Sequence, residues 1–112
     1  MKLSSSHFGN ATVICPRDAI VQGECELLRT AVDEAMLSGR GCVVVDLSEV
    51  PFIDSAGLEL LYDLLDAAAE RGHALKLAAA SEVCQEILRI TNLADHFGMY
   101  ASIEDAARSL VP

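Results

Sequence analysis

The sequence has no apolar stretch close to the roughly 20 uninterrupted residues that a membrane-spanning helix needs, so we expect no direct membrane insertion. The first residues, 1–7, lack the apolar core of a secretory signal. There is no Cys-x-x-Cys pair either. The chain has four cysteines, enough for two disulfides, but they are widely spaced and the spacing does not indicate disulfides. We therefore expect a reducing, cytoplasmic location. The cysteines are Cys15, Cys25, Cys42 and Cys84.

Basic side chains are also scarce. The 112 residues include 8 Lys and Arg against 17 Asp and Glu, which gives a net charge of -9. Nucleic acid and anionic membranes would repel so acidic a chain, so we expect neither as a broad-surface partner. A basic protein, or a partner that recognises a local patch, is favoured. The hydrophobic fraction of 52% argues against intrinsic disorder.

The motifs of common enzyme classes are missing. The chain has no G-x-x-x-x-G-K-[ST], G-x-G-x-x-G or G-x-S-x-G, so we expect neither an enzyme nor a bound cofactor. His7, His73 and His96 fall at expected strand or loop ends, where a surface histidine is the simplest interpretation. A zinc site that uses Cys84 and His96 would have no recognisable ligand spacing, so we also expect no metal.

What is present is one alternation of strands and helices, without a linker or a repeat, which favours a single domain over residues 1–112. The patterns predict strands at 2–8, 11–15, 42–47, 73–79 and 97–100, and helices at 24–37, 55–71, 82–91 and 103–110. This order predicts an α/β fold with about four helices. Its central sheet would be mostly parallel, with four to five strands and an antiparallel edge hairpin.

Some local signals are sharper than others. Residues 42–47 form a continuous apolar run rich in β-branched side chains, which is typical of a strand covered on both faces. Ser81 is a natural N-cap for the third helix, whose apolar positions would be Val83, Ile87 and Ile90. Pro16 should end the second strand or mark a sheet edge, because it cannot donate a ladder hydrogen bond.

One segment, Val50–Leu58, joins the buried strand to the second helix at the end of the sheet where ligands of open α/β folds bind. Two interpretations remain open. In the first, Asp54 or Ser55 is an N-cap and Gly57 allows close packing of the first turn. In the second, Ser55 is a phosphorylation switch, because a helix N-terminus tolerates a phosphate and the added dianion would disturb a partner docked over the apolar loop.

At these residues the chain resembles the STAS domain, as found in bacterial anti-sigma-factor antagonists. The resemblance runs from about Ala11 to Leu110. Its central signature is residues 43–50 (VVVDLSEV) followed by 52–58 (FIDSAGL). The next strand and a late helix end are similar too, at 72–77 (GHALKL) and 90–97 (ITNLADHF).

The resemblance implies a STAS-like fold and a partner-switching role. In such antagonists a serine is phosphorylated by an anti-sigma factor that is itself a serine kinase with a histidine-kinase-like ATPase fold, and a serine phosphatase resets the cycle. Here the phosphoacceptor would be Ser55. The implied partner-binding residues are Pro51, Phe52, Ile53, Asp54, Ser55, Ala56, Gly57 and Leu58.

Two positions depart from the family pattern. Ala56 replaces a second hydroxyl residue often seen after the serine, which leaves Ser55 as the only hydroxyl in the motif. The family usually has a Gly-x-Leu-Asp-like turn after the second strand, where this chain has Asp18–Val21 in the ungapped placement.

Two further alternatives stay open. The chain could be the STAS subunit of an ABC-type lipid transporter, a cytoplasmic docking module that needs no modified serine. The first helix, Glu24–Leu37, is a second candidate surface because it should flank the loop, or it is an ordinary core-covering helix.

Overall fold

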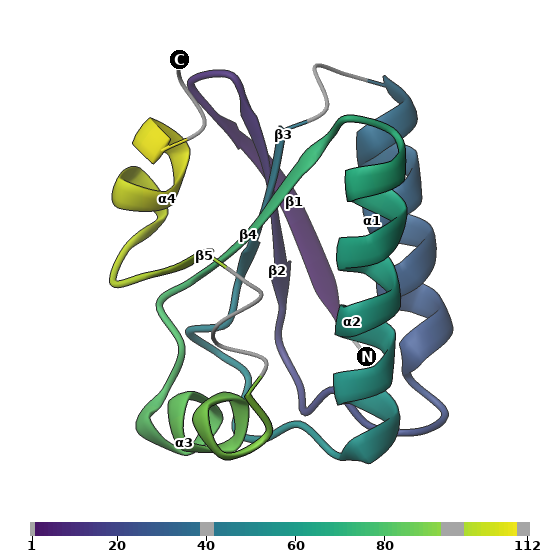
Figure 1. The fold of residues 1–112 in the computed structure, drawn as a ribbon, viewed down its shortest axis with the longest axis vertical. Coiled ribbons are helices and arrows are strands. Elements are labelled where there is room, and N and C mark those ends of the chain that lie inside the picture. Colours follow the sequence, from purple (N-terminus) through teal and green to yellow (C-terminus); the bar gives the residue numbers. More distant parts are fainter. Residues whose placement is uncertain (1, 39–41, 93–97, 110–112) are drawn as a thin grey trace.

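The computed structural model describes residues 2–38, 42–92 and 98–109. Within these ranges an opening pair of strands is followed by alternating helices and strands, as predicted (Figure 1). The elements are β1 (Leu3–Phe8), β2 (Ala11–Pro16), α1 (Cys25–Ser38), β3 (Cys42–Asp46), α2 (Ser55–Glu70), β4 (Ala74–Ala78), α3 (Glu82–Ile90), β5 (Gly98–Tyr100) and α4 (Ile103–Ser109).

The five strands form one sheet in the order β1-β2-β3-β4-β5. Only β1 and β2 pair antiparallel, through a turn at Gly9, whose φ of +59° suits glycine. The other neighbouring strands pair parallel. The predicted fold class is therefore confirmed: a mostly parallel sheet with an antiparallel edge hairpin. Pro16 ends β2, as expected.

The helices cover both faces of this sheet. Helices α1 and α2 lie side by side on one face, α4 lies on the other, and α3 lies across the end where β4 runs out (Figure 1). Strand β3 shows why both faces are apolar. Its Val43 and Val45 pack into the larger core with α1 and α2, while Val44 packs into a smaller core with α4. All three valines are fully buried, so the predicted two-sided strand is confirmed.

The prediction for the apolar face of α3 is wrong at two of its three positions, whereas the third, Ile87, is half-buried. Val83 and Ile90 are 53% and 66% exposed, whereas Cys84 and Leu88 are fully buried. The predicted N-cap Ser81 is confirmed, because its Oγ accepts a hydrogen bond from the backbone N–H of Cys84. Cys84 and Leu88 are four residues apart, so they lie on the same face of the helix.

Some expectations fall outside the described residues. These are the stop of the first helix at Gly39, the start of the fifth strand at Phe97, His96, most of the 90–97 motif, and the last helical turn at Leu110. Among the residues that are described, no helix is long and apolar enough to cross a membrane.

Candidate functional site

The segment Val50–Leu58 lies where the parallel strands end, and three neighbours fix its course. Its first carbonyl, that of Val50, accepts hydrogen bonds from Ser81 Oγ at 3.4 Å and from Cys84 Sγ at 3.3 Å. Further along, Ile53 forms an isolated parallel bridge with Ile20, from the loop between β2 and α1. The segment is thus held by α3 on one side and by the β2–α1 loop on the other.

Asp54 is the N-cap of α2, which confirms the capping interpretation for this residue. Its Oδ1 accepts a hydrogen bond from the Gly57 backbone N–H at 2.8 Å, and its Oδ2 accepts one from the Gln22 backbone N–H at 3.0 Å. These two hydrogen bonds hold the pKa of Asp54 below the ordinary value of an aspartate, and the bond from Gly57 has the larger effect. One carboxylate therefore both starts α2 and attaches the β2–α1 loop to it.

Gly57 is required by the close approach of that loop. A Cβ at this position would lie 2.2 Å from the Ile20 carbonyl oxygen and 2.8 Å from Ile53 Cγ2. The same Ile20 carbonyl accepts a hydrogen bond from the Asp54 backbone N–H at 3.2 Å, so it cannot move aside without loss. The expected close packing of the first turn at Gly57 is confirmed.

The residues of the motif divide into exposed and buried ones. Pro51, Phe52 and Ser55 are exposed, and Phe52 exposes 47% of its surface. Ile53 is only 4% exposed and Gly57 is buried. Within the expected partner-binding set, these two buried residues position the turn, and contact of the set with a partner stays a prediction. Asp54, Ala56 and Leu58 are half-buried.

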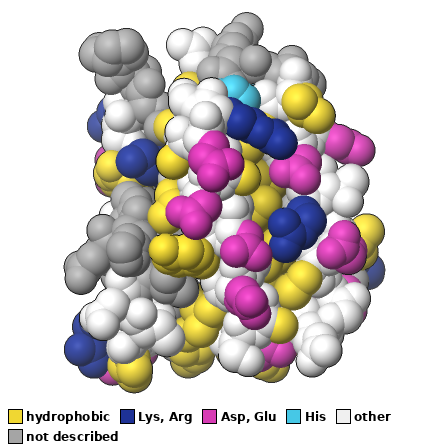
Figure 2. Space-filling model, turned by 45° about the vertical axis from the view of Figure 1, so that its right-hand side comes forward, with side chains coloured by type: hydrophobic (Ala, Val, Ile, Leu, Met, Phe, Trp, Pro, Cys, Tyr) yellow, Lys and Arg dark blue, Asp and Glu magenta, His cyan; other side chains and the backbone are white. Residues whose placement is uncertain are grey.

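Helix α1 flanks this turn, as expected. A groove of about 350 Å³ runs between α1 and α2 and reaches the turn at Ala56. Arg29 spans it, with its Nε 3.8 Å from Glu26 Oε1 and its terminal NH2 nitrogen 3.7 Å from Asp63 Oδ2. The remaining lining residues are Gln22, Gly23, Cys25, Glu59 and Leu60. Figure 2 shows acidic side chains spread over this face of the molecule.

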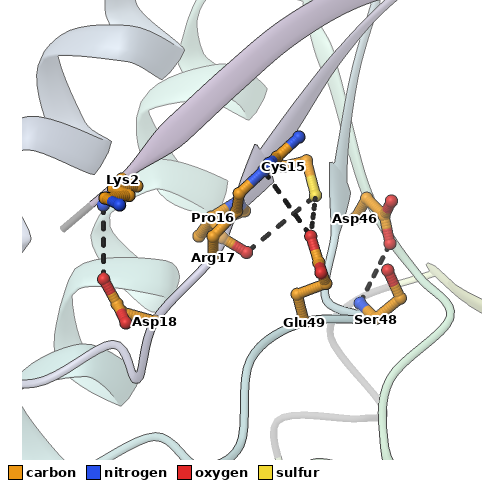
Figure 3. Close-up of polar contacts among 8 residues, drawn as sticks. All are labelled: Lys2, Cys15, Pro16, Arg17, Asp18, Asp46, Ser48 and Glu49. Atoms are coloured by element: carbon orange, nitrogen blue, oxygen red, sulfur yellow. Dashed lines mark hydrogen bonds and ion pairs between the residues drawn. The ribbon is translucent and has the colours of Figure 1, made fainter.

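The segment that departs from the family pattern, Asp18–Val21, lies against the site. Its Ile20 forms the bridge to Ile53 with backbone atoms and packs its fully buried side chain into the core. The family comparison pointed to this segment as a whole, but no residue-type signal pointed to the backbone contacts of Ile20 or to Gln22. At the start of the segment, the Lys2 backbone N–H donates to Asp18 Oδ2 at 3.4 Å (Figure 3).

A second group of polar contacts joins the end of β2 to the loop after β3 (Figure 3). Glu49 Oε2 lies 3.6 Å from Arg17 Nε and 4.0 Å from Cys15 Sγ. Burial, followed by the negative charge of Asp46, raises the pKa of the Cys15 thiol. The Arg17 and Glu49 side chains are 55% and 56% exposed, so their ion pair contributes little to stability.

The cysteines and histidines outside the turn were the other candidates for chemistry, and most of them lie in the described ranges. Cys15, Cys25 and Cys84 are free thiols, and burial together with the Asp54 charge raises the pKa of Cys25. His7 is exposed, but His73 is half-buried with a buried Nδ1, which corrects the expectation of a surface histidine there. In the described part of the chain, no group of His, Cys, Asp or Glu side chains could hold a metal ion.

Comparisons with known proteins agree with this architecture. The family model described as the STAS domain matches residues 4–106. A Thermotoga maritima protein, provisionally assigned as an anti-sigma factor antagonist, is similar in structure, with a TM-score of 0.88 and 22% identity over 96% of this chain and 93% of that one. No curated protein matches by sequence.

Solved structures of two further proteins share the fold. The unphosphorylated form of the antagonist SpoIIAA of Bacillus has a TM-score of 0.78 and 17% identity, with 99% of this chain and 100% of that one covered. A structure of SpoIIAA in its phosphorylated form is also similar. A sulfate transporter family protein from Wolinella succinogenes has a TM-score of 0.78 and 17% identity, with 90% of this chain and 84% of that one covered.

Proposed function

Because this chain belongs to the STAS domain family, we propose that it is an anti-sigma-factor antagonist switched by phosphorylation of Ser55. Its partner is an anti-sigma factor with a histidine-kinase-like ATPase fold that acts as a serine kinase. Unphosphorylated antagonist occupies this partner and frees the sigma factor, and a serine phosphatase resets the cycle. The chain is the kinase's substrate and has no catalytic step of its own. The pathway uses ATP and a sigma factor, so its place is the cytoplasm.

The exposure of Ser55 is the observation that carries this proposal. Ser55 is the first residue of the 16-residue helix α2, and its side chain faces solvent. The cap is already supplied by Asp54, so the Ser55 hydroxyl is not needed to start the helix. The turn around it is held rigid by Gly57 and Ile20, so a kinase would meet a hydroxyl in one fixed place.

The proposed modification transfers a phosphoryl group from ATP. A bond forms between Ser55 Oγ and the γ-phosphorus, the bond from that phosphorus to the β–γ bridging oxygen breaks, and ADP leaves. The hydroxyl proton passes to a base of the kinase. In the reset, water attacks the phosphorus under the phosphatase, and Ser55 and inorganic phosphate are released.

A phosphate here would oppose docking for two reasons. It carries about -1.5 to -2 charges and a strongly held water shell. It would stand beside Asp54 and near the exposed Phe52, at a surface where docking has to remove water. Apolar contact and a solvated dianion are incompatible in one interface, so binding and modification exclude each other.

A docking module of a membrane transporter is the second candidate. The fold shared with the sulfate transporter family protein supports it. In that role the same turn would be a permanent contact face, and Ser55 would serve only as a surface residue. The exposed hydroxyl beside an independent cap favours the switch.

A pull-down with recovered intact mass tests the proposal. Wild type, Ser55→Ala and Ser55→Asp are used as baits in native lysate, with Ser5→Asp as a control that adds the same charge on exposed strand β1. We expect the wild type from cells to carry one phosphate at Ser55, and a kinase-like partner to be lost with Ser55→Asp alone. An unmodified wild type that recovers the same transporter subunits with every bait would overturn the switch.

A further inference from the structure

A phosphate on Ser55 would be added to a face that is already acidic. The sequences of α1 and α2 contain three and four carboxylates, and Arg29 is the single basic residue in these two helices. Figure 2 shows acidic side chains spread over this face, with basic ones among them. A nearby cation would stabilise the new charge, and Arg29 is the basic residue that lines the groove.

The geometry of α2 places Ser55 in line with that cation. Residues Ser55, Glu59 and Asp63 are spaced by four, so they lie on one stripe of the helix. Glu59 and Asp63 line the groove, and Asp63 already contacts Arg29. Ser55 thus stands at the end of the stripe that Arg29 reaches from α1, and its neighbour Ala56 lines the same groove.

The present contacts of Arg29 are weak enough to exchange. Both are ion pairs of 3.7 and 3.8 Å, and the carboxylate side chains of Asp63 and Glu26 are 53% and 87% exposed. Exposed pairs of this kind contribute little to stability. A phosphate offers the guanidinium a doubly charged, bidentate partner, which forms shorter and stronger hydrogen bonds. The N-terminal end of α2 favours the anion as well.

We propose that Arg29 is the internal receptor of the Ser55 phosphate, an inference that rests on the phosphorylation in the proposed function. The guanidinium leaves Asp63 and binds the phosphate across the mouth of the groove. It then covers the apolar floor formed by Cys25, Ala56 and Leu60. One modification therefore changes a surface much larger than the serine itself.

The proposal is tested without any partner by placing phosphoserine at position 55 of the full chain through a recoded codon. The second ionisation of the phosphate, ordinarily near pH 6, is followed by phosphorus NMR. We expect this pKa to be about half a unit or more higher in Arg29→Gln than in the wild type, because a nearby cation favours the dianion. Arg29→Lys keeps the positive charge but loses the bidentate guanidinium, so its phosphate pKa should lie between those of the wild type and Arg29→Gln.

Arg71→Gln is the matched control. It removes the same charge from the other end of α2, where Arg71 is the C-cap, and it should titrate like the wild type. The unphosphorylated variants are checked for unchanged helical circular dichroism. Equal phosphate titration in wild type, Arg29→Gln and Arg71→Gln would overturn the receptor role of Arg29.

Binding to the anti-sigma kinase separates this inference from the function on which it rests. We expect phosphorylation to weaken binding of the wild type at least tenfold more than binding of Arg29→Gln. If phosphorylation weakens both proteins equally, the switch stands and the role of Arg29 in it fails. If the kinase binds both forms of the wild type alike while the phosphate still titrates under the control of Arg29, the proposed function fails and the receptor stands.

Discussion

The helices α2 and α3 begin in the same local way at the same end of the sheet, but against different neighbours. Each starts after a short polar side chain, Asp54 or Ser81, that accepts a hydrogen bond from the backbone N–H of the third helical residue. In α2 that residue is Gly57, and the backbone of Ile20 fills the place of a side chain. In α3 it is Cys84, fully buried. Capping decides where a helix begins, whereas packing decides what its third residue can be.

The first residue of each helix differs as well. In α3 it is the acid Glu82, which suits the positive end of the helix dipole. The first turn of α2 contains no acid and presents the hydroxyl of Ser55. A negative group that α3 has permanently could be added to α2 by modification, which supports the proposed switch.

The largest difference between the two starts should come from their third residues. Gly57→Ala forces a Cβ to within 2.2 Å of the Ile20 carbonyl oxygen. We expect it to lower the free energy of unfolding by about 3 kcal/mol, at the upper end for overpacked sites. Cys84→Ala removes one buried sulfur atom with its hydrogen bond to the Val50 carbonyl, and should cost about 1 kcal/mol. Urea unfolding measures both, and equal losses would mean that the loop yields to the new methyl group.

The caps give the next contrast. Ser81→Ala should destabilise the protein by about 1 kcal/mol, as expected for a lost N-cap. Asp54→Ala should destabilise the protein more, because the backbone N–H groups of both Gln22 and Gly57 lose their acceptor. Amide hydrogen exchange locates the effect: Gln22 should exchange faster in Asp54→Ala and not in Ser81→Ala. Unchanged exchange at Gln22 would show that the β2–α1 loop is held without the carboxylate.

Sequence patterns predicted the parts of these two sites that depend on residue type. The cap Ser81, the small residue at Gly57 and the strand–helix order all leave a signature in side chains. The bridge between Ile20 and Ile53 does not, because backbone atoms form it across 33 positions of the chain. Pattern reading also misplaced the apolar face of α3, since Val83 and Ile87 have the same four-residue spacing as the buried Cys84 and Leu88. The contact of Cys84 with the Val50 carbonyl lies on the buried face and is formed with a residue 34 positions away, so no local pattern predicts it.

The pH dependence of stability should separate the charged cap from the neutral one. The folded-state pKa of Asp54 is depressed, so the stabilisation it gives is complete above the unfolded value, about 3.9. It is lost as the pH falls through the lower, folded-state pKa. Asp54→Asn keeps a capping side chain without this ionisation, so its stability should fall less than that of wild type between pH 7 and pH 2. Ser81→Ala should keep the full pH dependence of the wild type, and parallel curves for Asp54→Asn and wild type would contradict the assignment.

The smallest effect on stability is expected at the first residue of each helix, Ser55 in α2 and Glu82 in α3. This pair of residues tests the proposed function most directly. Ser55 is exposed and does not cap the helix, so Ser55→Ala should change the free energy of unfolding by less than about 0.5 kcal/mol. Glu82→Ala at the matching position of α3 should lose only a few tenths of a kcal/mol of dipole interaction. The two variants are therefore nearly silent in urea unfolding. They should differ in partner binding, where Ser55→Ala is held constitutively in the bound state and Glu82→Ala remains regulated like the wild type. A residue that serves as a switch should change binding without changing stability. A Ser55→Ala protein that unfolds at lower urea than the wild type would therefore assign the hydroxyl a structural role. A Ser55→Ala protein that is released from its partner like the wild type would show that the switch lies at another residue.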